Sequence, residues 1–138
     1  MPIYSHSGPV TQLKLSPSKN DMILSCSSDW SLKLWKIEKN SDLRELMIFK
    51  FTEQIIDINW CPYNDKVFVS ATRSSIQLWN IDESVLDPSF TIEIQDKSGV
   101  SAVLFSKNAP VLVVALTDGR IELYSILDPS IIQDFPFD

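Results

Sequence analysis

The fold is decided by residues 23–35, which read ILSCSSDWSLKLW in one-letter code. An apolar run leads into the polar stretch Ser27-Ser28-Asp29, and apolar and polar residues then alternate from Ser31 to Trp35. Alternation at a period of two is typical of a β-strand with one buried face, and polar clusters of this kind mark turns. We therefore predict two strands joined by a short turn, the second strand ending in an aromatic residue.

The same pattern occurs three times in the chain. Apolar runs at 22–26, 67–71 and 111–115 are each followed by an alternating segment that ends in an aromatic residue. Leu15, Trp60 and Phe105 precede these runs and lie 45 residues apart, and we predict that they occupy equivalent buried positions. Several short strands in a unit of about 40–45 residues are the sequence signature of a β-propeller blade.

Two further segments are candidates for a fourth, outer strand, namely residues 43–49 and 90–94, although the first is also compatible with a short helix. We predict an all-β fold of about three four-stranded antiparallel blades, an incomplete propeller. The whole chain, 1–138, is then one partial propeller domain with repeats at about 6–51, 52–96 and 97–138. The stretch 128–138 could supply the outer strand of the third blade.

The first repeat resembles a WD repeat. His6 precedes the innermost strand, Ser25 lies in the second strand, Asp29 lies in the following turn and Trp35 closes the third strand. In that family these four residue types form a hydrogen-bonded tetrad across one blade. A buried Asp carboxylate needs donors, which imidazole, hydroxyl and indole groups supply. The resemblance therefore implies a structural tetrad of His6, Ser25, Asp29 and Trp35.

The other two repeats depart from this pattern. The second has no histidine and carries Arg73 near the Asp position, whereas the third keeps Asp118 but has Tyr124 in place of Trp and also lacks a histidine. We therefore expect the tetrad to be lost in the second repeat and altered in the third.

A narrower resemblance is to the dynein intermediate chains. Residues 23–35 are similar to the family stretch FLSCSADW…VKIW, residues 57–68 to DVAWSPYSSTVFA, and residues 117–121 fall where the family has DSDGQV. Residues 76–88 and 103–108 resemble the axonemal intermediate chain of the two-headed inner-arm dynein. The chain departs from the family at Ala115-Leu116, where Val-Gly is usual.

This resemblance implies a non-catalytic scaffold subunit of an axonemal inner-arm dynein, which binds the heavy chain and supports motor assembly and ciliary or flagellar motility. Other dynein intermediate and light chains are further implied partners. The implied location is the cytoplasm, the cytoskeleton and the axoneme of a cilium or flagellum. The alternative is a cytosolic WD-repeat adaptor that has no relation to dynein.

Family propellers have about seven blades, so three blades resemble a C-terminal fragment, a short isoform or a piece that needs a partner. Repeats need neighbours to bury their faces, so three blades alone leave two apolar faces bare. We therefore expect the polypeptide to self-associate, to aggregate or to need further blades or a dynein subunit.

The composition argues against several other classes of protein. Twelve Lys and Arg against 18 Asp and Glu give a net charge of −6, which does not suit a nucleic-acid surface. The sequence contains no run of about 18 apolar residues, the length that a membrane-spanning helix needs, and its first residues do not resemble a secretory signal. Eight of the acidic residues fall in residues 52–96, which form either a solvated face or a contact for a basic partner.

Catalytic and metal-binding motifs are also missing from the sequence. Two cysteines and one histidine cannot fill a four-ligand zinc site, and neither a Gly-rich phosphate loop nor a nucleophile elbow occurs. We predict no enzyme activity, no catalytic residue, no cofactor or metal and no small-molecule substrate. Cys26 and Cys61 are expected to be inert, in a reducing compartment.

Trp30 is the one candidate interface residue. It occupies a turn position where many WD repeats carry Gly, and an exposed Trp is a natural interface anchor. The indole could equally fold back onto its own blade, and the sequence leaves both alternatives open.

Overall fold

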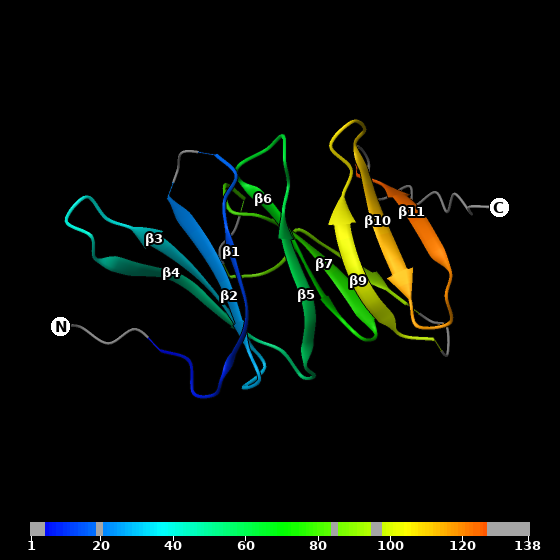
Figure 1. Cartoon of the computed structure of the whole chain (residues 1–138), viewed down its shortest axis with the longest axis horizontal. Coiled ribbons are helices and arrows are strands. Elements are labelled where there is room, and N and C mark those ends of the chain that lie inside the picture. Colours follow the sequence, from blue (N-terminus) through cyan, green and yellow to red (C-terminus); the bar gives the residue numbers. More distant parts are fainter. Residues whose placement is uncertain (1–4, 19–20, 84–85, 95–97, 127–138) are drawn as a thin grey trace.

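The computed structural model describes residues 5–18, 21–83, 86–94 and 98–126, and all the secondary-structure elements in these ranges are β-strands. Eleven strands in this described part form three antiparallel sheets, in which consecutive strands pair (Figure 1). We call the sheets blades one, two and three. Their strands are β1 (Val10–Leu15), β2 (Met22–Ser27), β3 (Ser31–Ile37) and β4 (Leu43–Lys50); β5 (Ile55–Trp60), β6 (Val67–Thr72), β7 (Ser75–Asn80) and β8 (Phe90–Glu93); and β9 (Val100–Phe105), β10 (Val111–Leu116) and β11 (Ile121–Ser125).

The predicted all-β fold of antiparallel blades is confirmed. Residues 43–50 form the outer strand β4, so the helical alternative for this segment is wrong. Blade three has three strands within the described residues, not four. The outer strand predicted from residues 128–138 lies outside the described part of the chain.

Each blade begins with a β-bulge at the same place in the repeat. In β1, β5 and β9 the pairing register with the second strand slips by one residue, and the residues skipped are Thr11, Ile56 and Ser101. These three lie 45 residues apart. A bulge adds local right-handed twist. The 45-residue repeat is therefore present in the backbone geometry as well as in the residue types.

Two hydrophobic cores lie between the blades. The first joins blade one to blade two: Leu24 and Leu32 pack against residues that include Phe68 and Trp79, whose rings stack with centroids 5.6 Å apart. The second joins blade two to blade three, and it includes Val69 on the opposite face of β6. Because β6 is buried on both faces, its side chains are largely apolar along the whole strand.

Side chains of the first strands also tie neighbouring blades together. The Gln12 side-chain amide donates to the Ile56 carbonyl (2.9 Å), and the Asn59 amide donates to the Val103 carbonyl (2.7 Å). The Asp57 carboxylate accepts from the Val103 N–H at 3.0 Å. These bonds use backbone groups that the bulged first strands present to their neighbours, so they fix the register between blades.

The prediction that Leu15, Trp60 and Phe105 are all buried is wrong for one of them. Trp60 and Phe105 are each 7% exposed, but Leu15 is 63% exposed. The three positions are equivalent in the ladder, since Leu15 pairs with Ile23 as Trp60 pairs with Phe68. The difference arises because this side of each sheet packs on the preceding blade, and no described blade precedes blade one.

Candidate functional site

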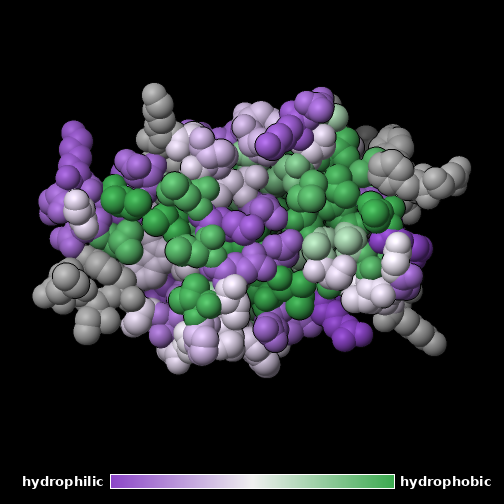
Figure 2. All heavy atoms as spheres, in the orientation of Figure 1, coloured by the Kyte–Doolittle hydropathy of each residue, from purple (hydrophilic) through white to green (hydrophobic). Residues whose placement is uncertain are grey.

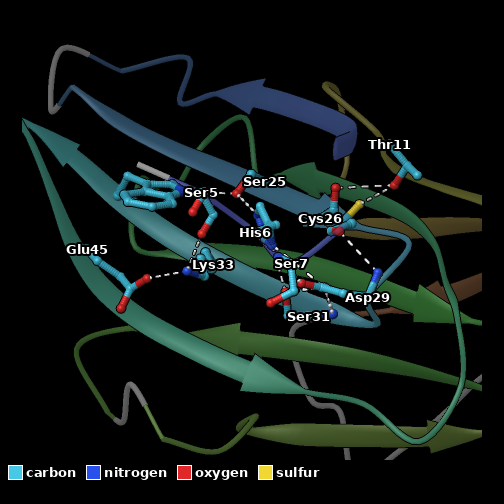
Figure 3. A network of polar contacts seen from close by, with 12 residues as sticks. Ser5, His6, Ser7, Thr11, Ser25, Cys26, Asp29, Ser31, Lys33 and Glu45 are labelled. Atoms are coloured by element: carbon cyan, nitrogen blue, oxygen red, sulfur yellow. Dashed lines mark hydrogen bonds and ion pairs between the residues drawn. The ribbon is translucent and has the colours of Figure 1, made fainter. Parts of the chain in front are cut away.

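The four residues predicted as a tetrad come together in blade one. Figure 3 shows His6 between Ser25 and Asp29. Trp35 Nε1 donates to Ser25 Oγ at 2.8 Å, and Ser25 Oγ lies 2.6 Å from His6 Nε2. The other imidazole nitrogen, Nδ1, lies 2.7 Å from the hydroxyl of Ser31, which donates to Asp29 Oδ1 at 2.5 Å. The contacts therefore run from the indole in β3, through β2 and the segment before β1, to the β2–β3 turn.

Ser31 is the member that sequence reasoning missed. His6 Nδ1 is 3.8 Å from Asp29 Oδ1, beyond direct hydrogen-bond distance, and the Ser31 hydroxyl bridges the two groups. The signal was present, because Ser31 follows Asp29 by two residues, the spacing at which an Asp side chain accepts from the backbone of a turn. The Ser31 N–H makes that bond at 2.8 Å.

The carboxylate fixes the direction of the hydrogen bonds between Asp29 and His6 Nδ1. Asp29 only accepts when ionised, so the Ser31 hydroxyl donates to it and its lone pair accepts from His6 Nδ1–H. His6 Nε2 then accepts from Ser25, whose oxygen accepts from the Trp35 indole. These directions are those of a neutral imidazole with its proton on Nδ1.

Burial and hydrogen bonding support these protonation states. Burial lowers the pKa of His6 from its ordinary value, although the nearby Asp29 charge opposes this effect. For Asp29, burial would raise the pKa, but hydrogen bonds from the Ser31 hydroxyl and from the Ser7 and Ser31 N–H groups outweigh it and hold the pKa well below the usual range. The network is thus a neutral imidazole facing an ionised carboxylate through one hydroxyl.

Blade two builds an equivalent chain of bonds without a histidine. Trp79 Nε1 donates to Ser70 Oγ (2.9 Å), which donates to Gln77 Oε1 (2.9 Å), and Gln77 Nε2 donates to Ser75 Oγ (2.6 Å). The amide of Gln77 accepts on one side and donates on the other, as His6 does in blade one. The turn between β6 and β7 contains only Arg73 and one further residue, and no Asp.

Blade three uses charged groups in the same place. The Tyr124 hydroxyl donates to Glu122, which lies 3.5 Å from Arg120, and Arg120 Nε donates to Asp118 at 2.8 Å. A hydrogen bond from the Arg120 N–H lowers the pKa of Asp118. Glu122 stands at the position of Gln77 in the repeat. In each of the three blades, a different set of polar side chains is therefore hydrogen-bonded beside the closing aromatic residue.

Trp30 lies in the β2–β3 turn with a φ of 69°, in the left-handed region that non-glycine residues rarely adopt. The corresponding residue of blade three, which also follows the turn Asp, is Gly119 with a φ of 94°. Trp30 is 45% exposed, so its surface is partly packed and partly open to solvent. Its carbonyl accepts from the Phe51 N–H at 2.8 Å, which ties the turn to the segment that enters blade two.

The described residues contain no cluster of three or more His, Cys, Asp or Glu side chains placed to hold a metal ion. In the same part of the chain no helix is long and apolar enough to cross a membrane. Cys26 and Cys61 are both buried, and burial raises the pKa of the Cys26 thiol. A buried, protonated thiol is a poor nucleophile, in agreement with the inert role predicted for Cys26.

Comparison with known proteins identifies the repeat family. Residues 2–36 match the family model described as "WD domain, G-beta repeat". Blade one therefore carries a WD repeat. The match covers β1, β2, most of β3 and the residues of the network, but not β4. The C-terminal WD40 domain of Sif2 superimposes on 90% of this chain and 33% of that chain, with a TM-score of 0.72 and 22% identity.

Two relatives are similar to larger parts of this chain. The dynein axonemal intermediate chain 4 of Homo sapiens is 27% identical over 129 residues, which is 93% of this chain and 15% of that protein. The histone acetyltransferase type B subunit 2 of Debaryomyces hansenii is 32% identical over 66% of this chain and 25% of that protein. The predicted resemblance to an axonemal dynein intermediate chain is confirmed as homology, and the chain spans about 15% of the length of that relative.

Proposed function

We propose that the chain is a non-catalytic scaffold subunit of an axonemal dynein complex. The observation that carries the proposal is the homology to dynein axonemal intermediate chain 4, which extends over 93% of the chain and all three blades. Heavy-chain binding, a role in inner-arm assembly and motility, and a location in the axoneme are parts of this proposal, as are contacts with other intermediate and light chains.

The structure suits a scaffold because packing and hydrogen bonds tie its sheets and several of its turns together. The two inter-blade cores fix the sheets, and the side-chain networks fix the turns at their ends. The β2–β3 turn is held by Asp29, which accepts from the N–H groups of Ser31 and of Ser7 in the segment before β1. A turn that is already ordered loses little conformational entropy when a partner binds.

Trp30 is the residue that we propose for the contact. The network that holds Asp29 also holds the next residue in a left-handed conformation, which costs on the order of 1–3 kcal/mol. Blade three avoids this cost by having Gly119 at the equivalent position. Blade one instead has Trp30 there, and the residue presents a large, partly exposed apolar ring to solvent. Tryptophan is among the residues that dominate binding energy at protein interfaces.

Co-purification from axonemal extract tests the proposal. The tagged chain is expected to recover dynein heavy chain, identified by mass spectrometry. Trp30→Gly keeps the backbone conformation accessible and removes the indole, so it is expected to reduce heavy-chain recovery at least about tenfold. Tyr63→Ala is the matched control, because Tyr63 is also an exposed aromatic but lies in the loop between β5 and β6.

Recovery of the chain without any heavy chain would overturn the dynein assignment. Equal loss in both variants would show that Trp30 has no special role. The alternative function, a WD-repeat adaptor outside dynein, is favoured by the 32% identity to a histone acetyltransferase subunit. It predicts recovery of a non-motor complex in the same experiment.

A further inference from the structure

Two sheet faces at opposite ends of the described blades carry exposed and half-buried apolar side chains. The front face belongs to blade one and consists of Val10, Leu13, Leu15, Ile23 and Leu43. The back face belongs to blade three and consists of Leu104, Val113, Ala115, Ile121 and Leu123. Figure 2 shows apolar side chains gathered over blade one and over β9–β11, with hydrophilic side chains between them.

The front face is a copy of faces that are buried elsewhere in the chain. Leu13 pairs across its sheet with Ser25, as Ile58 does with Ser70 in blade two, where the same face packs on blade one. Leu13 is 65% exposed, whereas Ile58 is fully buried. Val10, Leu13, Ile23 and Leu43 also line a hollow of about 190 Å³ above Trp35, so the surface has a shape that a side chain can enter.

The back face is likewise a copy of faces that are buried in the first two blades. Val113 and Ala115 stand where blade two has Val69 and Ala71, and Ile121 stands where it has Ile76. In blade two these residues form the core against blade three. In blade three Ile121 is 47% exposed.

The described part of the chain therefore contains two examples of a back face packed on a front face, and one more of each is not covered by another described blade. We propose that the chain self-associates head to tail: the front face of one copy packs on the back face of a second copy, with the geometry of the internal blade junctions. Two copies joined at both faces supply six blades, within the range of about four to eight at which propellers close. A contact between different faces can close into a ring in this way.

The charge of the chain sets the conditions for this association. The apolar residues of both faces are uncharged, and the charged residues Lys33 and Glu45 on the front face pair with one another at 2.7 Å, whereas each copy carries a net charge of −6. Two copies therefore repel one another at long range, and added salt screens this repulsion. The dimer is expected to strengthen as the ionic strength rises, unlike a contact that depends on ion pairs.

The test uses the full 138-residue chain and its molar mass in solution, measured by light scattering after gel filtration at several concentrations. The wild-type chain is expected to have the mass of two copies. Leu13→Arg on the front face and Ile121→Arg on the back face are each expected to give monomers. Leu86→Arg is the matched control, since this exposed leucine lies outside both faces, and it is expected to remain dimeric.

Mixing the two single-face variants is the decisive step. The Leu13→Arg copy retains its back face and the Ile121→Arg copy retains its front face, so an equimolar mixture is expected to form a dimer although neither variant does so alone. Leu15→Arg and Leu104→Arg repeat the test at independent positions, and circular dichroism confirms that each variant is folded. A monomeric wild type, dimeric single variants, a mixture that stays monomeric, or wild-type masses that grow without a plateau at two copies would each overturn the proposal.

Discussion

Removing the Ser31 hydroxyl tests the member of the blade-one network that was not predicted from the sequence. Ser31 is fully buried, and its hydroxyl bridges His6 Nδ1 and Asp29 Oδ1. Ser31→Ala leaves the Nδ1–H of a buried imidazole without its acceptor. Leaving a buried donor unsatisfied costs about 1–3 kcal/mol. For a chain of this size that is a fall in Tm of roughly 4–12 °C.

The measurement is urea unfolding followed by circular dichroism at pH 7. Every variant is compared at one protein concentration, because association would itself add stability. Ser28→Ala is the matched control, since Ser28 lies in the same turn but is exposed, and a loss below about 0.5 kcal/mol is expected. Asp29→Ala is expected to cost a similar 1–3 kcal/mol, and the double variant Ser31→Ala/Asp29→Ala less than the sum of the two.

Two results would refute this reasoning. A loss for Ser31→Ala no larger than that for Ser28→Ala would show that the hydroxyl bridge does not stabilise the fold. Additive losses in the double variant, within about 0.3 kcal/mol, would show that Ser31 and Asp29 act independently rather than in one network.

Three further predictions concern protonation and blade two. Because burial lowers the pKa of His6, the unfolded chain binds more protons near pH 6, so the contribution of His6 to stability is complete above about pH 6.5 and falls as the pH drops below it. The free energy of unfolding is therefore expected to change less between pH 7.5 and 5.5 in His6→Gln than in the wild type. An equal change in the two proteins would contradict the assignment. Gln77→Ala is expected to lose about 1–3 kcal/mol in urea unfolding, because the Ser70 hydroxyl loses its acceptor, and a neutral result would remove Gln77 from the network. The raised thiol pKa and burial of Cys26 predict that a maleimide reagent labels the folded chain slowly and the urea-unfolded chain rapidly, whereas rapid labelling of folded protein at this site would contradict the placement.

The repeat and the blade architecture could be predicted from the sequence because each depends on local, periodic information. The 45-residue spacing and the alternation before Trp35 identify strands wherever they lie in space. The positions of the β-bulges also repeat, but Thr11 and Ile56 give no sequence signal that distinguishes a bulge from a regular strand.

The structure differs from the predictions where burial depends on a neighbouring blade. Leu15 is as apolar as its equivalents, and its exposure follows from the absence of a described blade on that side rather than from any local property. Similarly, Gln77 looks like a polar residue on the exposed face of a strand. Its role as a replacement for the imidazole becomes visible only when Ser70 and Ser75 are seen on either side of it.

Cross-linking of intact axonemal dynein with a lysine-reactive reagent, read out by mass spectrometry, tests the central claim most directly. Lys50 pairs with Ser31 at the end of the blade that carries Trp30, and Lys39 lies in the β3–β4 turn. Both are exposed, so the reagent reaches either one in the free chain. A dynein scaffold that binds through Trp30 predicts cross-links from Lys50 to the heavy chain and none from Lys39. Heavy-chain cross-links through Lys39 alone, or the absence of this chain from the cross-linked dynein, would contradict it.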